Sequence, residues 1–271
     1  NPTWRYAVLW RLNTDGSGGT EDIHTGVNGQ FNDIAYANGN LYVVGYALTS
    51  VGSESLSGAS DVWLAKYSFV SGTVTYLWSK LYGPNSDDVG YAIVIDSLGS
   101  NFYIAGESVN GTQSSMTVYQ LYDDGLVNQT WTVSSARNQV RDMVLIGSKV
   151  CLIGTSNATY NTAGQILGSA NNTATVWCLN QANISQIAYV TSINCDECQG
   201  TGIATSATQD TLYIVGSTTS RYESLTASQP SAFLGLYSPS GSFINGTLLS
   251  LASNSTEVQK LWVDSVGNIR A

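Results

Sequence analysis

Short runs of β-branched and aromatic residues, each closed by a glycine, recur four times along the chain. They read LYVVG, FYIAG, VCLIG and LYIVG, and they end at Gly45, Gly106, Gly154 and Gly216. Apolar runs of this length between turn residues are typical of β-strands. No stretch shows a helical periodicity of useful length, so the pattern predicts an all-β chain.

Each glycine-closed run has a similar set of neighbours. An apolar segment precedes it, at residues 33–37, 91–95, 142–146 and 202–207. Another apolar segment follows it, at residues 61–68, 116–122, 174–180 and 232–238. Turn signals such as NGN and DSLGS join the first two segments as hairpins. A fourth segment, such as residues 75–83, completes a four-stranded antiparallel unit, and repeats of this period are typical of β-propeller blades.

The two ends of the chain each match part of this unit. Residues 260–271 match a first strand and part of a second, whereas residues 4–16 and 20–28 match a third and a fourth strand. We therefore expect a five-bladed ring in which the two ends share one blade and leave no open sheet edge. The expected single domain, residues 1–271, has blades at about 31–89, 90–139, 140–200, 201–258, and 259–271 with 1–30.

Residues 61–108 resemble the β-propeller repeats called SBBP repeats. That pattern has an Asp-x-hydrophobic-Leu-x-Lys-Tyr strand, a glycine turn, a Trp strand, Tyr-Gly-Gly, and then Asp-x-x-Gly-Asn-x-Tyr-x-x-Gly. The match is close over this stretch and degenerate elsewhere: Pro84 replaces the second glycine, and the third unit lacks the turn Asp and the Tyr. The resemblance implies a β-propeller over nearly the whole chain but no particular function, because such repeats occur in proteins of many roles.

The chain carries few charges. Only 11% of its 271 residues are charged, Lys and Arg together number 10, and the formal net charge is −9. Such a surface repels nucleic acid and anionic lipid, so we expect neither as a partner. No apolar run approaches the roughly 18 residues that a membrane span needs. Because the chain begins at Asn1 without an apolar leader, we expect a processed chain or a segment of a larger protein.

Asn-x-Ser/Thr sequons occur seven times. They lie at Asn110, Asn128, Asn157, Asn171, Asn183, Asn245 and Asn254. Chance produces several sequons in a chain this rich in Ser and Thr, so their positions carry more weight than their number. None falls in the first two strand segments of a unit. We expect several to be glycosylated in a eukaryotic secretory pathway, where glycans would solubilise a surface with few charges.

Four cysteines point to the same compartment. Cys151 and Cys178 fall on the second and third strands of one unit and can face each other across the sheet. Cys195 and Cys198 can close a small loop. Free buried thiols, a redox dithiol and half a metal site are the alternatives, but a redox C-x-x-C favours a helix N-terminus and zinc needs more ligands. We expect structural disulfides and an extracellular, secreted or cell-surface protein.

Candidate catalytic groups are sparse. His24 is the only histidine, so triad and multi-histidine mechanisms are disfavoured. Aligning the first strands places five residues at one level near the ring axis: Asp33, Tyr91, Asp142, Gly202 and Gln259. The acids Asp33 and Asp142 are the candidates for a glycosidase pair at the channel mouth, and the structural alternative is that they bind backbone amides. No loop has the calcium-binding D-x-D-x-D-G pattern, so we expect no metal and no cofactor.

The longest connections between repeats are residues 46–60, 155–172 and 217–230, and a meander places them all on one face. A rigid ring with variable loops on one face is typical of a recognition surface. We therefore expect a non-enzymatic extracellular glycoprotein for structural assembly or protein interaction, such as a repeating bead of a cell-surface or secreted fibre. Its partners would be other proteins or further copies. The alternatives are a carbohydrate-binding lectin, in which recurrent Trp and Tyr stack on sugars rather than between blades, and a glycoside hydrolase.

Overall fold

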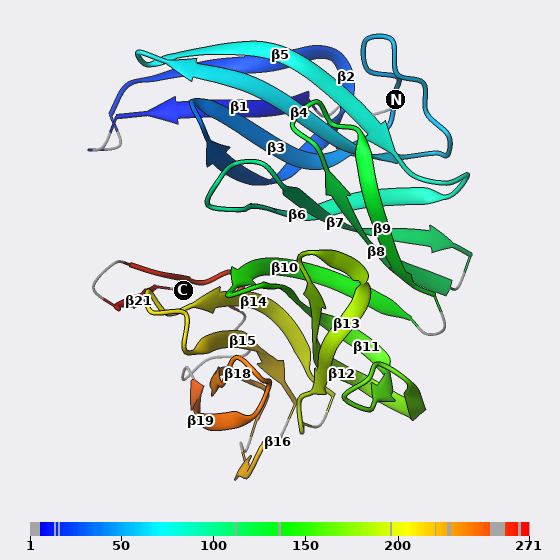
Figure 1. Cartoon of the computed structure of the whole chain (residues 1–271), viewed down its shortest axis with the longest axis vertical. Helices are drawn as coiled ribbons and strands as arrows, with labels where there is room; N and C mark the ends of the chain where they lie inside the picture. The colour runs from blue at the N-terminus through cyan, green and yellow to red at the C-terminus, as the bar shows by residue number, and fades with distance from the viewer. Residues whose placement is uncertain are drawn as a thin grey trace. The chain divides into compact units, whose positions relative to one another are not determined.

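The computed structural model describes residues 6–13, 15, 17–111, 113–134, 137–195, 197–219, 221–226, 229–249, 258–264 and 267–270. Strands are the only regular secondary structure in these ranges, which confirms the all-β prediction (Figure 1). The chain divides into two compact units. One comprises Asn1–Thr112 and Leu121–Leu126, and the other comprises Gln113–Gln120 and Val127–Ala271.

The first unit contains a five-stranded antiparallel sheet. Its strands follow one another in chain order: β1 (Tyr6–Leu12), β2 (Gly19–Ala37), β3 (Asn40–Ala47), β4 (Asp61–Val70) and β5 (Thr73–Tyr82). A second pair follows, β6 (Asp87–Ile95) and β7 (Phe102–Asn110), and it is also antiparallel. The predicted meander from residue 33 to residue 83 is therefore present.

Strand β2 differs from the prediction in its length. The strands expected at residues 20–28 and 33–37 form one strand of 19 residues. Its first part pairs with β1 and its second part pairs with β3, so the predicted hairpin at the N-terminal end exists but runs straight into the next meander. Gly29 permits this passage, because a Cβ there would lie 2.4 Å from the backbone oxygen of Tyr46.

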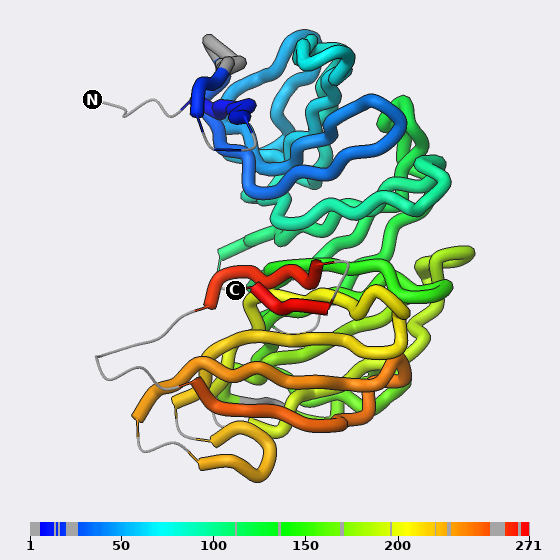
Figure 2. Tube along the Cα trace, turned by 90° about the vertical axis from the view of Figure 1, so that its left-hand side faces the viewer, coloured from blue at the N-terminus to red at the C-terminus, as the bar shows by residue number. Residues whose placement is uncertain are grey.

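The second unit contains two four-stranded antiparallel sheets. One is formed by β10 (Asn138–Ile146), β11 (Lys149–Tyr160), β12 (Ile166–Asn180) and β13 (Asn183–Ser192). The other is formed by β14 (Gln199–Thr205), β15 (Leu212–Thr218), β18 (Ser231–Tyr237) and β19 (Phe243–Leu249). Figure 2 shows this second sheet as adjacent yellow and orange segments. All eight strands were expected.

Two further strands and two short hairpins complete the second unit. Strand β8 (Gln113–Leu121), whose last residue belongs to the first unit, neighbours β9 (Val127–Val133). A small hairpin of β16 (Arg221–Tyr222) and β17 (Leu225–Thr226) lies in the connection between β15 and β18. Near the C-terminus, β20 (Trp262–Val263) pairs with β21 (Ile269–Arg270), which agrees with the predicted hairpin there.

The connection expected over residues 155–172 is mostly strand. Strand β11 continues to Tyr160, and the chain turns at residues 161–165 before β12 begins. The Asn161 side chain accepts hydrogen bonds from the amides of Ala163 and Gln165, and Gly164 takes a φ of +80°. This turn lets the two strands extend outward as a hairpin, so the long polar loop that we predicted does not exist there.

The recurrent glycines have a common structural cause. The first strand of each repeat carries a β-bulge, located between Phe31 and Asp33, Gly90 and Ala92, Val140 and Asp142, and Gly200 and Gly202. The repeated glycine lies opposite each bulge. A Cβ at Gly154 would come 1.8 Å from the Gln139 oxygen, and one at Gly45 would come 1.8 Å from the Gln30 oxygen. Only glycine permits so close an approach of two backbones.

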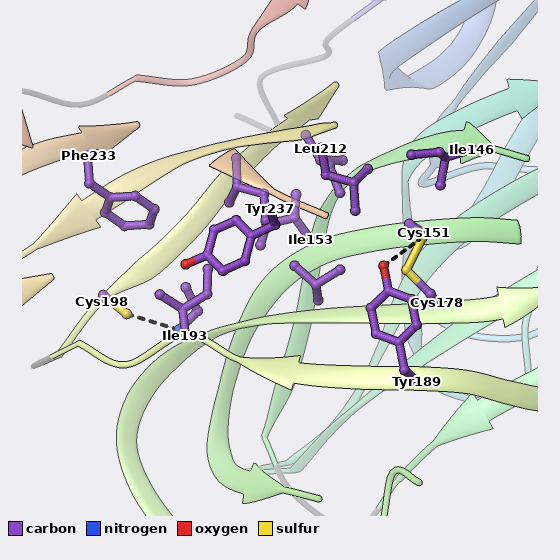
Figure 3. Packing of buried hydrophobic residues seen from close by; sticks show 14 of the residues in the cluster. Ile146, Cys151, Ile153, Cys178, Tyr189, Ile193, Cys198, Leu212, Phe233 and Tyr237 are labelled. Carbon is purple, nitrogen blue, oxygen red and sulfur yellow. Dashed lines mark hydrogen bonds between the residues drawn. A yellow bond between two sulfur atoms is a disulfide. The ribbon is translucent and has the colours of Figure 1, made fainter. Parts of the chain in front are cut away.

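Aromatic side chains fill the cores. Trp63 in the first unit and Trp177 in the second are fully buried, and Trp131 is nearly so. The ring of Phe31 packs 4.4 Å from that of Trp63. These positions follow the packing interpretation rather than the sugar-stacking one. Trp10 departs from it, because 62% of its surface is exposed. In the second unit the core passes between the two sheets through Ile153, Phe233 and their neighbours (Figure 3).

Candidate functional site

Six of the seven sequon asparagines lie within the described residues, and all six are exposed. They are Asn110, Asn128, Asn157, Asn171, Asn183 and Asn245. Asn254 lies outside the described residues. Exposure of the whole set is what attachment of a bulky glycan requires.

The placement of three sequons differs from the prediction. Asn110 and Asn157 belong to second strands, β7 and β11, because these strands continue past their closing glycines. Asn171 lies in β12 rather than in a loop. The remaining three positions are on the fourth strands, at the start of β13 and within β9 and β19.

Several of these side chains are oriented by local hydrogen bonds. The Oδ1 atom of Asn157 accepts the backbone N–H of Arg137 at 2.7 Å, and that of Asn183 accepts the N–H of Ser185 at 3.1 Å. Their Nδ2 atoms, to which a glycan would be attached, have no hydrogen-bond partner within the described ranges. The oxygen therefore fixes each side chain while the nitrogen stays accessible.

The four cysteines form the two expected disulfides. Cys151 and Cys178 are fully buried and directly opposite each other on β11 and β12, with Cα atoms 4.1 Å apart. The Tyr189 hydroxyl lies 3.9 Å from the Cys151 sulfur (Figure 3). Cys195 and Cys198 close the short loop before β14. Two disulfides are consistent with an oxidising compartment.

Asp33 and Asp142 each bind a backbone amide of the neighbouring first strand. Asp33 Oδ2 accepts the N–H of Ile93 at 3.0 Å, and Asp142 Oδ2 accepts the N–H of Ile203 at 3.0 Å. Asp142 is 3% exposed, and its Oδ1 lies 3.6 Å from Lys260 Nζ. Both carboxylates therefore take part in the structural contacts that we weighed against a catalytic role.

The alignment that placed five first-strand residues at one level near the ring axis needs one correction. Ala92, not Tyr91, pairs across the sheet as Asp33 and Asp142 do, because the β-bulge displaces Tyr91 by one position. The Thr201 hydroxyl donates a hydrogen bond to the Val258 oxygen, so the segment at Val258 runs beside β14.

Two further buried acids have structural partners. Asp61 is buried and accepts the amides of Ser57 and Gly58. Asp88 is also buried, and desolvation raises its pKa to about 6, against the opposing hydrogen bonds from Ser108 and Ser86. The described residues contain no group of three or more His, Cys, Asp or Glu side chains arranged to hold a metal ion. The side chain of His24 lies outside the described part.

A polar pocket of about 190 Å³ lies between the two sheets of the second unit. Its lining consists of Arg137, Gln139, Thr155, Asn172 and Gln199. These residues come from β10, β11, β12, β14 and the segment before β10. Sequence reasoning missed the pocket, because its residues are far apart in the chain and form no motif.

Two sequon asparagines adjoin residues that line this pocket. The backbone of Arg137 exchanges hydrogen bonds with Asn157, and Asn171 directly precedes the lining residue Asn172. The Oε1 atom of Gln139 accepts a hydrogen bond from Arg141 at 3.1 Å. The pocket therefore has a cationic and amide-rich character within a chain whose net charge is −9.

No protein-family profile matches this sequence, and no curated protein matches it either. Among solved structures, the chain is similar to the Dos1 propeller, with a TM-score of 0.50 and 9% identity over 95% of this chain and 54% of that one. It also matches the propeller domain of Cps50 (Swd1) from Myceliophteria thermophila, with a TM-score of 0.47 and 10% identity over 94% and 70% of the two chains.

A putative 6-phosphogluconolactonase from Bacteroides fragilis gives a TM-score of 0.43 at 12% identity, over 95% of this chain and 80% of that one. The likeness to the Dos1 structure shows a β-propeller fold and nothing about function. This chain spans about half the length of the Dos1 chain. Within the described residues, no helix has the length and apolarity needed to cross a membrane.

Proposed function

We propose that this chain is a non-enzymatic extracellular glycoprotein module that serves structural assembly or protein interaction. The exposure of all six described sequon asparagines is the observation that carries the proposal. Glycans at these positions would cover a surface on which only 11% of residues are charged. The two disulfides support the same compartment, because such bonds persist outside the reducing cytosol.

The module would be one five-bladed ring in which the two ends of the chain share a blade. Residues 258–261 run beside β14, as the first strand of a further blade would. Strands β20 and β21 continue this segment as a hairpin. At the other end, β1 and the first part of β2 supply a second hairpin. Among the described strands, β1 and β21 each stand last in their sheets, as the proposed pairing of the two ends requires.

A role in assembly or protein interaction is supported by the outward face of β1. The alternating residues Tyr6, Val8, Trp10 and Leu12 are all at least 41% exposed. A continuous apolar row of this kind is typical of a contact surface for protein. A glycosidase role is disfavoured because Asp33 and Asp142 bind backbone amides.

Sedimentation and negative-stain electron microscopy of the protein secreted from eukaryotic cells test this function. We expect ordered self-association or a stable complex with another protein, weakened by Trp10→Ser. The matched control is Leu98→Ser, which removes an exposed side chain from a turn of the same unit. Hydrolysis of glycosides that is lost in Asp33→Asn or Asp142→Asn would contradict the proposal.

A further inference from the structure

Three of the side chains that line the pocket of the second unit are exposed, Arg137, Asn172 and Gln199, and a fourth, Thr155, is buried. The side chains of Arg137, Thr155, Asn172 and Gln199 make no hydrogen bond within the described part of the chain. Polar side chains elsewhere, such as Asp96 and Asn161, are bonded within their own turns. The polar atoms of these four side chains are therefore available to a polar ligand in the pocket.

The backbone beneath these side chains is held in place. The N–H of Cys198 donates to the Asn172 oxygen at 2.8 Å, and the disulfide of Cys198 with Cys195 lies directly before Gln199. On the opposite side, the backbone of Arg137 is bonded to Asn157 in both directions, at 2.7 and 3.1 Å. A pocket built on fixed backbone loses little entropy when it binds a ligand.

The charge of the lining selects an anion. Among the described residues that line the pocket, Arg137 is the only charged one, and none carries a carboxylate. Arg141 bonds the Oε1 atom of Gln139, so the amide group that Gln139 can still offer a ligand is its donor end. A guanidinium group recognises a carboxylate with two parallel hydrogen bonds.

The size and the other polar groups narrow the ligand further. A volume of about 190 Å³ is smaller than the roughly 300–1,000 Å³ of pockets that enclose drug-sized ligands. A single sugar unit is an appropriate size. The Thr155 hydroxyl and the amides of Asn172 and Gln199 both donate and accept, as sugar hydroxyls require. The described residues that line the pocket include no aromatic side chain.

We infer that this pocket binds a carboxylated sugar unit, with its carboxylate at Arg137 and its hydroxyls at Thr155, Asn172 and Gln199. This inference goes beyond the proposed function, because a glycoprotein module needs no such site. The acidic sugar could belong to the protein's own glycans at Asn157 or Asn171, which adjoin the pocket, or to a separate glycan. Both sources present the same chemistry.

Saturation-transfer NMR and calorimetry with three probes test the inference: glucuronate, glucose and acetate. We expect glucuronate to bind at least about tenfold more tightly than glucose, because glucose has no carboxylate to form the charge-assisted hydrogen bond with Arg137. We also expect it to bind more tightly than acetate, which lacks the hydroxyls. Arg137→Gln should abolish the preference for glucuronate over glucose, and Thr155→Val should weaken the binding of both sugars.

The control variant is Lys149→Gln, which removes one positive charge from the other end of β11 and should leave binding unchanged. Enzymatic removal of N-glycans distinguishes the two sources: tighter glucuronate binding afterwards indicates that the protein's own glycan competes, and unchanged binding indicates an external ligand. No binding by the deglycosylated protein, equal affinity for glucuronate and glucose, or binding that Arg137→Gln leaves intact would overturn the inference.

Discussion

Cys151 and Cys178 face each other at the position in the sheet that the first repeat gives to Tyr42 and Lys66. In both repeats the pair lies three residues before the cross-strand pair that contains the closing glycine, Gly154 or Gly45. In the first repeat, Lys66 Nζ lies 2.6 Å from Asp123 Oδ1, and the Tyr42 hydroxyl also donates to Asp123. The disulfide therefore occupies the place of a polar clamp, in the repeat that has Cys151 where the first repeat has Tyr42.

Removal of this disulfide should destabilise the protein substantially. The double variant Cys151→Ala with Cys178→Ala opens a loop of 27 residues, and the chain-entropy model gives a loss of about 3 kcal/mol in the free energy of unfolding. Urea denaturation measures this loss. The matched control is Cys195→Ala with Cys198→Ala, whose sequence separation of 3 gives about 2 kcal/mol or less. An equal loss from both variants would contradict this explanation.

Asp88 should make the protein less stable as the pH rises. Burial raises the pKa of Asp88 to about 6, above the value of roughly 3.9 for an unfolded chain. Between these values the unfolded state holds fewer protons than the folded state, so the free energy of unfolding falls as the pH increases from about 4 to about 6. Unfolding in urea at several pH values measures the effect.

The variant Asp88→Asn should remove this fall in stability between about pH 4 and pH 6. At neutral pH it should raise the free energy of unfolding by an amount on the order of 2 kcal/mol. Asp87→Asn is the control, because Asp87 is exposed at the neighbouring position and should change the pH dependence far less. If wild type and Asp88→Asn showed parallel stability curves over this range, Asp88 would not be titrating there.

Asp142 should be important for stability rather than for chemistry. Asp142→Ala leaves the buried N–H of Ile203 without its acceptor, which should cost about 1–3 kcal/mol of the free energy of unfolding. Asp142→Asn retains an oxygen acceptor and should lose less. Urea denaturation compares the two, and an alanine variant as stable as the asparagine variant would show that the hydrogen bond contributes little.

Ring closure predicts a connection between the two ends of the chain. If β21 pairs with the free edge of β1, deleting residues 262–271 should accelerate hydrogen exchange of the β1 amides at any protein concentration. Amides of β11 provide the internal control. Exchange in β1 that stays unchanged after the deletion would show that the two ends do not pair, and an effect seen only at high concentration would indicate pairing between copies.

The sequence predicts most strands because their apolar pattern repeats. Sixteen strand segments of the four complete repeats are found where spacing and turn residues place them. The details that fail depend on contacts between distant residues. Tyr91 is displaced by a β-bulge, which moves a residue to the other face without changing the apolar pattern. The outward hairpin around Asn161 depends on a side-chain bonded turn inside a polar stretch.

The candidate sites also fall into two groups, those that the sequence predicts and those that it does not. Sequons and cysteines are local signals, and the pairing of Cys151 with Cys178 follows directly from strand register. The pocket around Arg137 and the burial of Asp88 arise only when neighbouring strands meet, and neither residue belongs to a motif. Alignment of repeats therefore locates what recurs, whereas the features specific to one repeat require the folded chain.

Glycopeptide mass spectrometry of the native protein, with and without enzymatic deglycosylation, tests the central claim most directly. The account predicts N-linked glycans on several of the six exposed positions, Asn110, Asn128, Asn157, Asn171, Asn183 and Asn245, and no free thiol on the four cysteines. Unmodified asparagine at all six positions, together with reduced cysteines, would contradict an extracellular glycoprotein.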